Sequence, residues 1–249
     1  TEDVVTLASG DMDNDGDSDL IFGRAGGEAV ILQNPGDGSS LCGWNFASLG
    51  ASTTNTTAIV GSEFDNDGFQ DLFWGRGNTD GSSPHTLLRG TGNSFMEIPN
   101  SGVAIWTQNE KVMALPMDAN GDGWVDLVVG AEASNPTGKL RVLQNDLSML
   151  SNGRPLELRL HWDVPGSKNL DAIGAHLQIE GGGISVYRDV ITGGSWHTSL
   201  SSIIYAGVPA QKATVAVTWP DGSTSPPWTD LDTNACYVLT ASNESATPC

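Results

Sequence analysis

The sequence predicts an all-β protein: a partial β-propeller of three blades, followed by a C-terminal antiparallel domain that resembles a β-sandwich. Three observations support this: the apolar runs are short, the 249 residues include 31 Gly and 12 Pro, and an Asp-rich segment recurs. Gly and Pro at this frequency between short apolar runs are typical of strands and turns rather than helices. We expect the blades over residues 1–150 and the second domain over residues 151–249.

The internal repeat is the strongest signal for the blades. Three segments align, reading DMDNDGDSDLIFG at 11–23, EFDNDGFQDLFWG at 63–75 and DANGDGWVDLVVG at 118–130. A short apolar run precedes each segment, at 4–8, 57–60 and 111–115, and another follows it, at 29–32, 86–88 and 140–143. The unit is therefore strand, acidic loop, strand, turn and strand, with room for a fourth strand. A four-stranded unit of about 50 residues has the size of a propeller blade.

Each acidic loop has the residue pattern of a calcium site. Ca²⁺ takes six to eight oxygen ligands, and oxygen-bearing side chains at loop positions 1, 3 and 5 converge on one point. Gly at position 6 permits a sharp turn that brings the position 7 carbonyl to the ion, and position 9 supplies a further carboxylate. The predicted ligands are Asp11, Asp13, Asp15, the Asp17 carbonyl and Asp19; Glu63, Asp65, Asp67, the Phe69 carbonyl and Asp71; and Asp118, Asn120, Asp122, the Trp124 carbonyl and Asp126. We therefore predict three Ca²⁺ sites, since such a flexible cage suits Ca²⁺ better than Mg²⁺.

Two other interpretations of the loops are less consistent with the sequence. An EF-hand needs Glu at position 12 and flanking helices, but position 12 is Phe22, Trp74 or Val129, within a β-prone run. A single loop of this kind could be an Asx-rich turn without a metal. Three copies with the same Gly and the same final Asp-Leu argue against that.

The charge distribution agrees with cation binding. The formal net charge is −19, from 30 acidic and 11 basic residues, and twelve of the acidic residues lie in the windows 11–19, 63–71 and 118–126. Such crowding destabilises a folded loop unless a cation neutralises it. The same acidity excludes nucleic acid as a partner, because phosphates would be repelled.

The sequence also bears on localisation and covalent modification. No apolar run approaches the roughly 18–20 residues of a membrane span, and the chain begins at Thr1, so we expect a mature, processed or partial chain. Calcium loops of this kind need extracellular calcium to be occupied, so we expect the chain to be secreted or displayed at the cell surface. Cys236 and Cys249 are candidates for a disulfide, which would leave Cys42 free or paired with a cysteine outside this chain. Asn55 and Asn243 begin N-glycosylation sequons.

The repeats resemble FG-GAP repeats, the propeller repeats of the integrin-α type that are also called VCBS repeats. In that family the loop joins the first two strands of a blade, and the ion stabilises the hairpin. Loops one and two match the motif at every ligand position, with the conservative change to Glu63 at position 1. Loop three has Asn120, which still offers an oxygen. The resemblance covers residues 1 to about 147.

The composition changes near residue 150. Strand-like alternation follows at 156–162, 175–179, 185–191, 214–219 and 236–240, with turn signals at 181–183 and 220–223. The segments NLDAIGA (169–175), GGSW (193–196) and VTWPDGS (217–223) resemble the ASPIC/UnbV domain, which follows FG-GAP repeats in that family. The resemblance runs from about 155 to 241, and Tyr205–Pro209 departs from the expected aromatic-Gly-Leu-Gly run. It implies an extracellular, calcium-dependent module and no known reaction.

We find no sequence signature of an enzyme. The four histidines, at 85, 161, 176 and 197, form no HExxH motif, and Ser195 is not in a GxSxG elbow. Phosphate-binding Gly motifs are missing as well. The predicted function is that of an extracellular calcium-binding structural or adhesion protein. The alternatives are a lectin-like carbohydrate-binding module and a sugar lyase on a related propeller.

Three blades cannot close a propeller, which typically needs four to eight. Either this chain is part of a longer propeller, or other copies supply the missing neighbours in a surface assembly or filament. The expected partners are therefore calcium and either other copies of the chain or an extracellular protein or glycan.

Overall fold

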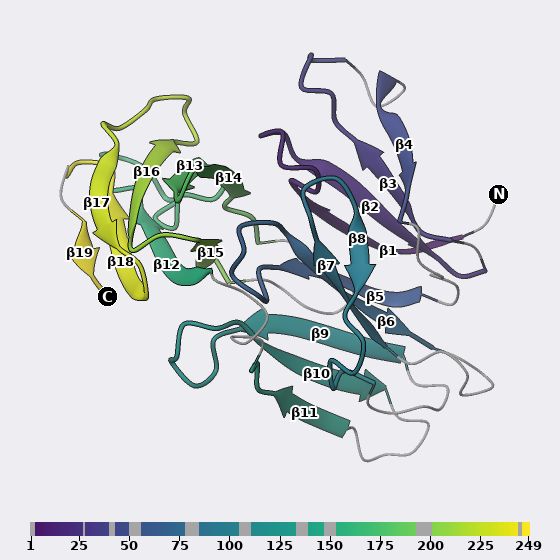
Figure 1. Ribbon diagram of the computed structural model, residues 1–249. Helices are drawn as coiled ribbons and strands as arrows, with labels where there is room; N and C mark the ends of the chain where they lie inside the picture. Colours follow the sequence, from purple (N-terminus) through teal and green to yellow (C-terminus); the bar gives the residue numbers. More distant parts are fainter. Residues whose placement is uncertain are drawn as a thin grey trace.

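The secondary-structure elements of the described residues are all β-strands, which form several sheets (Figure 1). The structure is a computed structural model that describes residues 3–26, 28–39, 43–49, 56–77, 85–104, 111–132, 139–146, 153–192, 201–243 and 246–249. The prediction of an all-β protein is confirmed. Within these described residues no helix is both long and apolar enough to cross a membrane.

Three sheets form the N-terminal part, and each contains one copy of the repeat. The first has the order β1 (Val4–Gly10), β2 (Asp19–Arg24), β3 (Val30–Gln33), β4 (Asn45–Ser48). The second has the order β5 (Thr56–Ser62), β6 (Asp71–Arg76), β7 (Thr86–Gly90), β8 (Phe95–Glu97). The third has β9 (Lys111–Met117), β10 (Asp126–Glu132) and β11 (Lys139–Leu143), with β10 in the middle. All pairs in these sheets are antiparallel.

The three sheets pack face to face in chain order. Trp74 and Leu72 of β6 point towards the first sheet, where they share a core with Ile21 of β2. Phe73, the residue between them, points to the opposite face and shares a second core with Val129 of β10. The middle sheet is therefore covered on both faces, and all six residues of β6 are buried. The described residues form no closed ring of sheets, so the partial propeller remains a prediction.

Two further sheets follow. One has the order β15 (Ile204–Val208), β12 (Arg154–His161), β18 (Ala235–Thr240), β19 (Thr247–Pro248). The other has the order β14 (Ile184–Asp189), β13 (His176–Gly181), β16 (Lys212–Thr218), β17 (Trp228–Asp232). The prediction of a purely antiparallel domain is wrong in one respect, because β12 and β18 pair in parallel. A parallel pair needs a long crossover, which here comprises the intervening strands.

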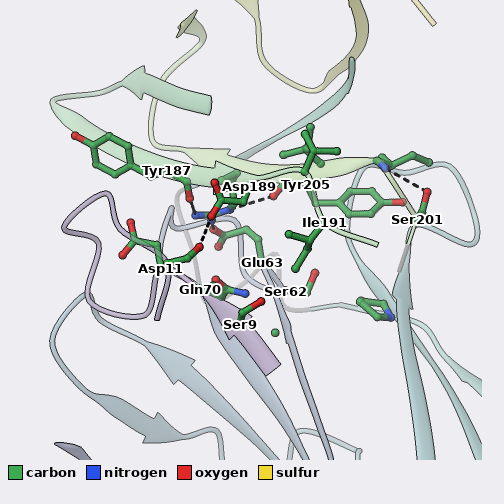
Figure 2. Close-up of a pocket in the computed structure, with 18 of the residues that line it drawn as sticks. Ser9, Asp11, Ser62, Glu63, Gln70, Tyr187, Asp189, Ile191, Ser201 and Tyr205 are labelled. Carbon is green, nitrogen blue, oxygen red and sulfur yellow. Dashed lines mark hydrogen bonds and ion pairs between the residues drawn. The ribbon is translucent and has the colours of Figure 1, made fainter. Parts of the chain in front are cut away.

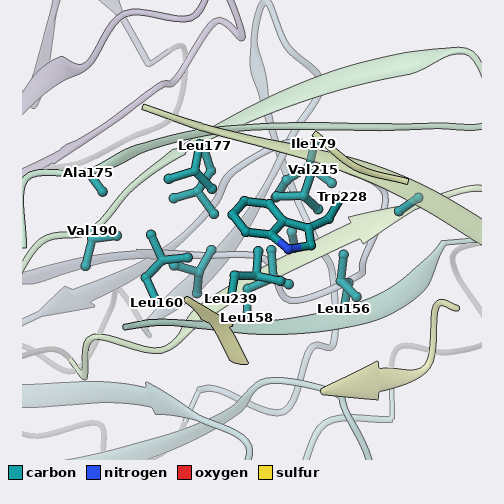
Figure 3. Close-up of a cluster of buried hydrophobic side chains, with 14 of the residues drawn as sticks. Leu156, Leu158, Leu160, Ala175, Leu177, Ile179, Val190, Val215, Trp228 and Leu239 are labelled. Atoms are coloured by element: carbon teal, nitrogen blue, oxygen red, sulfur yellow. The ribbon is translucent and has the colours of Figure 1, made fainter. Parts of the chain in front are cut away.

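The two C-terminal sheets enclose one apolar core. Leu158 of β12 lies on one side of Trp228 and Ile179 of β13 on the other (Figure 3). Trp228 also meets Trp219 edge to face, with ring centroids 6.5 Å apart. This arrangement is that of the expected sandwich.

Two turns give the sequence signals of this region a structural role. Asn169 closes the turn before β13, since its Nδ2 donates to the Ile173 carbonyl and its Oδ1 accepts from the Ile173 N–H, at 2.8 and 2.9 Å. The turn buries Ala172 and Ala175 completely. Gly182 and Gly183 both have positive φ, which suits the two-residue turn between β13 and β14.

The end of the chain is fixed by a disulfide. Cys236 of β18 bonds to Cys249, with Cα atoms 5.4 Å apart, and β19 pairs with β18 beside it. Cys42 and Asn55 lie outside the described residues. Asn243 lies in the turn after β18, where its N–H donates to the Thr240 carbonyl.

Candidate functional site

The three acidic loops join the first and second strands of their sheets and share one backbone shape. Positive φ angles occur at position 4, in Asn14, Asn66 and Gly121, and at position 6, in Gly16, Gly68 and Gly123. Left-handed backbone at these positions needs Gly or Asn, which explains the residue types in the motif. The residue at position 7 donates its N–H to the aspartate at position 5, from Asp17 to Asp15, from Phe69 to Asp67 and from Trp124 to Asp122.

The aspartate at position 9 holds each loop to the rest of its sheet. In loop two, Asp71 accepts the Phe64 N–H on Oδ2 and the Gly90 N–H on Oδ1, both at 2.8 Å. Asp19 makes the same bonds with Met12 and Asn34, and Asp126 makes them with Ala119 and Asn145. All three carboxylates are fully buried. From the sequence we predicted only metal binding for these three aspartates. In the structure they also connect each loop to the end of the third strand of its sheet. Two accepted bonds leave lone pairs for a further ligand.

Loop one brings three carboxylates together. Oxygens of Asp11, Asp13 and Asp15 all lie within 4.8 Å of one another. Oδ1 of Asp13 is buried and accepts no hydrogen bond, while Oδ2 accepts one from the Gln33 amide at 2.8 Å. Burial raises the pKa of Asp11 and of Asp13 to about 6, and the neighbouring acids add to the effect. A divalent cation fits this set, because it would neutralise crowded carboxylates and occupy the unpartnered oxygen.

Loop two is equally crowded. Oxygens of Glu63, Asp65 and Asp71 lie within 4.8 Å of one another. Glu63 is fully buried, and its Oε1 has no hydrogen-bond partner. Burial raises the pKa of Glu63 well above its usual range, and neighbouring Asp71 acts in the same direction. This buried, unpartnered oxygen also fits a cation.

Loop two differs from loop one in having two arginines against it. Arg89 places Nε 2.5 Å from Asp65 Oδ2 and Nη2 2.7 Å from Asp67 Oδ2. Arg188, from the C-terminal sheets, places Nη2 2.7 Å from Glu63 Oε2. Guanidinium groups therefore pair directly with carboxylates of loop two. The charge of Arg188 also acts on Asp11 of loop one, where it opposes the rise in pKa that burial causes.

The other two repeats have a different residue type at the position of Arg89. Leu88, the residue before it, pairs across the sheet with Leu72. The equivalent pairs in the other sheets are Leu32 with Leu20 and Leu143 with Leu127. The residues that follow those leucines are Gln33 and Gln144. The third strand therefore presents a neutral amide in two repeats and a guanidinium in the second.

Loop three is the most exposed of the three. Asp118 accepts the N–H groups of Gly121 and Gly123, both at 2.7 Å. Asn120 donates Nδ2 to Asp122 Oδ2 at 2.8 Å. The polar side chains of loop three therefore form hydrogen bonds with each other and with the backbone of the loop. The oxygen types still fit a cation, but this loop has the fewest acids.

All three loops face the C-terminal sheets. The Asn14 amide donates to the Ser185 carbonyl at 2.8 Å, and Ser18 bonds to Asp189. The N–H of Asp118 donates to the Tyr205 hydroxyl at 3.2 Å. In the second loop the Gly68 carbonyl accepts from Arg188 at 3.2 Å. Nothing in the spacing of the loop motifs indicated these contacts.

A cavity of about 100 Å³ lies at this junction. Asp11 and Glu63 line it on the loop side, and Tyr187, Asp189 and Tyr205 line it on the opposite side (Figure 2). The ligand-type oxygens of loops one and two therefore border one small cavity between the N-terminal and the C-terminal sheets.

Comparison with known families concerns the C-terminal part of the chain. Residues 165–246 match the family model described as ASPIC and UnbV. We call residues 165–246 the ASPIC/UnbV segment. This match confirms the resemblance expected from the NLDAIGA and VTWPDGS motifs, and no curated protein matches the chain. Arg188, Asp189 and Tyr205, which contact the acidic loops, belong to the ASPIC/UnbV segment. The resemblance of the repeats to FG-GAP repeats stays a prediction.

Proposed function

We propose that this protein is an extracellular, calcium-stabilised structural or adhesion module. Its three repeated loops would bind Ca²⁺, and the ASPIC/UnbV segment would pack against them. The observation that carries the proposal is the pair of carboxylate clusters in loops one and two, each with a buried oxygen that has no protein partner. The disulfide between Cys236 and Cys249 supports an extracellular location, since such bonds persist in oxidising compartments.

The ligand sets follow from the loops. Asp11, Asp13, Asp15 and Asp19 would hold the first ion, with the Asp17 carbonyl. The second and third ions would take the equivalent residues of loops two and three, from Glu63 to Asp71 and from Asp118 to Asp126. When bound, Ca²⁺ supplies the positive charge that lets these buried carboxylates remain ionised together.

Isothermal titration calorimetry of the metal-free chain tests the proposal. We expect saturable Ca²⁺ binding with constants of about 10⁻⁴–10⁻³ M, as in other extracellular modules. Asp13→Asn should weaken binding at loop one at least about tenfold, because it removes a charged ligand. Asp37→Asn is the matched control, since Asp37 lies in an exposed turn outside the loops. A chain that releases no saturable heat, or an Asp13→Asn variant that binds like the wild type, would refute the proposal.

Arg89→Gln should strengthen Ca²⁺ binding at loop two about tenfold. The change gives loop two the amide that loops one and three have at this position, and it removes a positive charge 2.5 Å from a ligand oxygen. The same titration measures it, with Arg159→Gln as the control, because Arg159 pairs with Glu157 and not with a carboxylate of loop two. Unchanged or weaker binding in Arg89→Gln would show that the guanidinium does not oppose the ion.

A further inference from the structure

The acid at position 1 makes different hydrogen bonds in loop two than in the other loops. Asp11 accepts the N–H groups of positions 5 and 6 of loop one, both at 3.1 Å. Asp118 accepts those of positions 4, 5 and 6 of loop three, at 2.7, 3.2 and 2.7 Å. Loop two lies wholly within the described residues, and there Glu63 accepts no N–H of its own loop. Its Oε2 accepts from Arg188 at 2.7 Å, and its Oε1 has no hydrogen-bond partner.

Arg188 is held in place by the C-terminal sheets. It belongs to β14, and its side chain is 11% exposed. Its Nη1 donates to the Tyr187 carbonyl at 2.8 Å, and its Nε donates to the Tyr205 carbonyl at 3.4 Å. These two bonds orient the guanidinium and leave Nη2 for loop two, where it bonds to Glu63 and to the Gly68 carbonyl. The C-terminal sheets therefore present a fixed positive charge to this loop.

The backbone of loop two is also enclosed by the C-terminal sheets. Asn66, at position 4, is 1% exposed, and a Cβ at Gly153 or at Gly207 would overlap its backbone. Gly153 precedes β12, and Gly207 lies in β15, which pairs with β12. Gly121, at position 4 of loop three, is exposed. Close backbone packing therefore holds Arg188 and Glu63 together, in addition to their charges.

A guanidinium in this position competes with a metal ion for loop two. Glu63 belongs to the oxygen cluster that also contains Asp65 and Asp71, so an ion held there would share the carboxylate of Glu63 with Arg188. Two positive charges at one buried carboxylate repel each other. We propose that the ASPIC/UnbV segment autoinhibits loop two, because it inserts Arg188 into the loop as an internal cation and so lowers the affinity of the loop for Ca²⁺.

This control rests on the proposed function, since it presupposes that loop two binds Ca²⁺. Linkage between the two cations is reciprocal, so an ion in loop two weakens the hold of Arg188 on Glu63 by the same factor. The calcium concentration would then set how firmly the ASPIC/UnbV segment is attached to the second sheet. Loops one and three, whose position 1 aspartates bond to their own loops, would bind Ca²⁺ without this competition.

Isothermal titration calorimetry of a chain in which only loop two keeps its full ligand set tests the autoinhibition. Asp13→Asn combined with Asp122→Asn removes a charged ligand from each of the other two loops. In this parent chain Arg188→Gln should strengthen Ca²⁺ binding at least about tenfold, because it removes the competing charge. Arg159→Gln is the matched control, since Arg159 pairs with Glu157 and not with a carboxylate of loop two. It should bind Ca²⁺ like the parent chain.

Glu63→Asp tests the same competition without removing a charge. It gives loop two the shorter acid that loops one and three have at position 1, so the carboxylate should turn from Arg188 to the N–H groups of its own loop. Ca²⁺ binding should again strengthen about tenfold, and adding Arg188→Gln should then change it little. Circular dichroism shows whether each variant folds.

The outcomes separate the autoinhibition from the proposed function. A folded Arg188→Gln variant that binds Ca²⁺ no more tightly than its parent overturns the autoinhibition. If Arg188→Gln does not fold, Glu63→Asp decides in the same way. Ca²⁺ binding by the unsubstituted chain together with no binding at loop two in any of these variants also overturns it. An unsubstituted chain that binds no Ca²⁺ at all refutes the proposed function itself.

Discussion

Removing calcium at neutral pH is expected to lower the unfolding midpoint of this protein by about 5–20 °C. An ion that binds only the folded state stabilises it by RT ln(1 + [L]/Kd), which at 2 mM Ca²⁺ and the affinities expected here is about 0.6–1.8 kcal/mol per site. For a chain of this size each kcal/mol moves the midpoint by about 2–4 °C. Circular dichroism melts in 2 mM Ca²⁺ and in metal-free buffer measure the difference. Equal midpoints at neutral pH would mean that the loops hold no ion that matters for the fold.

The metal-free protein should also show an unusual pH dependence. Burial raises the pKa of Asp11, Asp13 and Asp65 to about 6 in the folded chain. The folded state then keeps protons that the unfolded state has already lost, so these groups reduce the free energy of unfolding as pH rises from about 4 to about 6. Above that interval their contribution is constant.

Calcium should reverse this trend. Protons and Ca²⁺ compete for the same carboxylates, so the stabilisation by calcium grows as pH rises through about 6. Melts at several pH values between about 4.5 and 7.5, with and without calcium, should therefore diverge towards neutral pH. An unfolding midpoint of the metal-free protein that increased as pH rises to about 6 would contradict the raised pKa values.

The repeated loops could be predicted from the sequence because their chemistry is local. Gly16 and Gly68 stand where the loop backbone has a positive φ angle. The aspartates stand where side chains within nine residues of one another can reach the same point. The disulfide is local in the same sense, since only 13 residues separate its cysteines. The all-β class could be predicted for a similar reason, because the alternation of apolar and polar residues is visible within each strand alone.

Contacts between distant segments could not be obtained in this way. Arg188 lies 125 residues from Glu63, and no periodicity connects them. The parallel pairing of β12 with β18 is equally non-local, because it depends on how the intervening strands cross the sandwich. Arg89 is a different case: its alignment with Gln33 and Gln144 is visible in the sequence, but its meaning depends on the 2.5 Å approach to Asp65.

The largest effect of a single substitution is expected at Arg188. Its guanidinium pairs with the buried carboxylate of Glu63 and also donates to the carbonyls of Gly68 and Tyr187. Arg188→Met leaves Glu63 buried without its partner, and breaking such a pair costs about 3–5 kcal/mol. Because the ASPIC/UnbV segment supplies Arg188 and the repeats supply Glu63, this free energy links the two parts of the chain.

A double-mutant cycle measured by urea unfolding separates the pair from simple loss of packing. Glu63→Gln in the Arg188→Met background should recover part of the loss, since it removes the stranded charge. The control is Arg159→Met, whose exposed pair with Glu157 should be worth less than about 1 kcal/mol. The cost of Arg188→Met should shrink at acidic pH, where Glu63 can take up a proton, and in calcium, where an ion can replace the lost charge. If Arg188→Met were as mild as Arg159→Met in metal-free buffer at neutral pH, the acidic loops and the ASPIC/UnbV segment would be in contact without being energetically coupled.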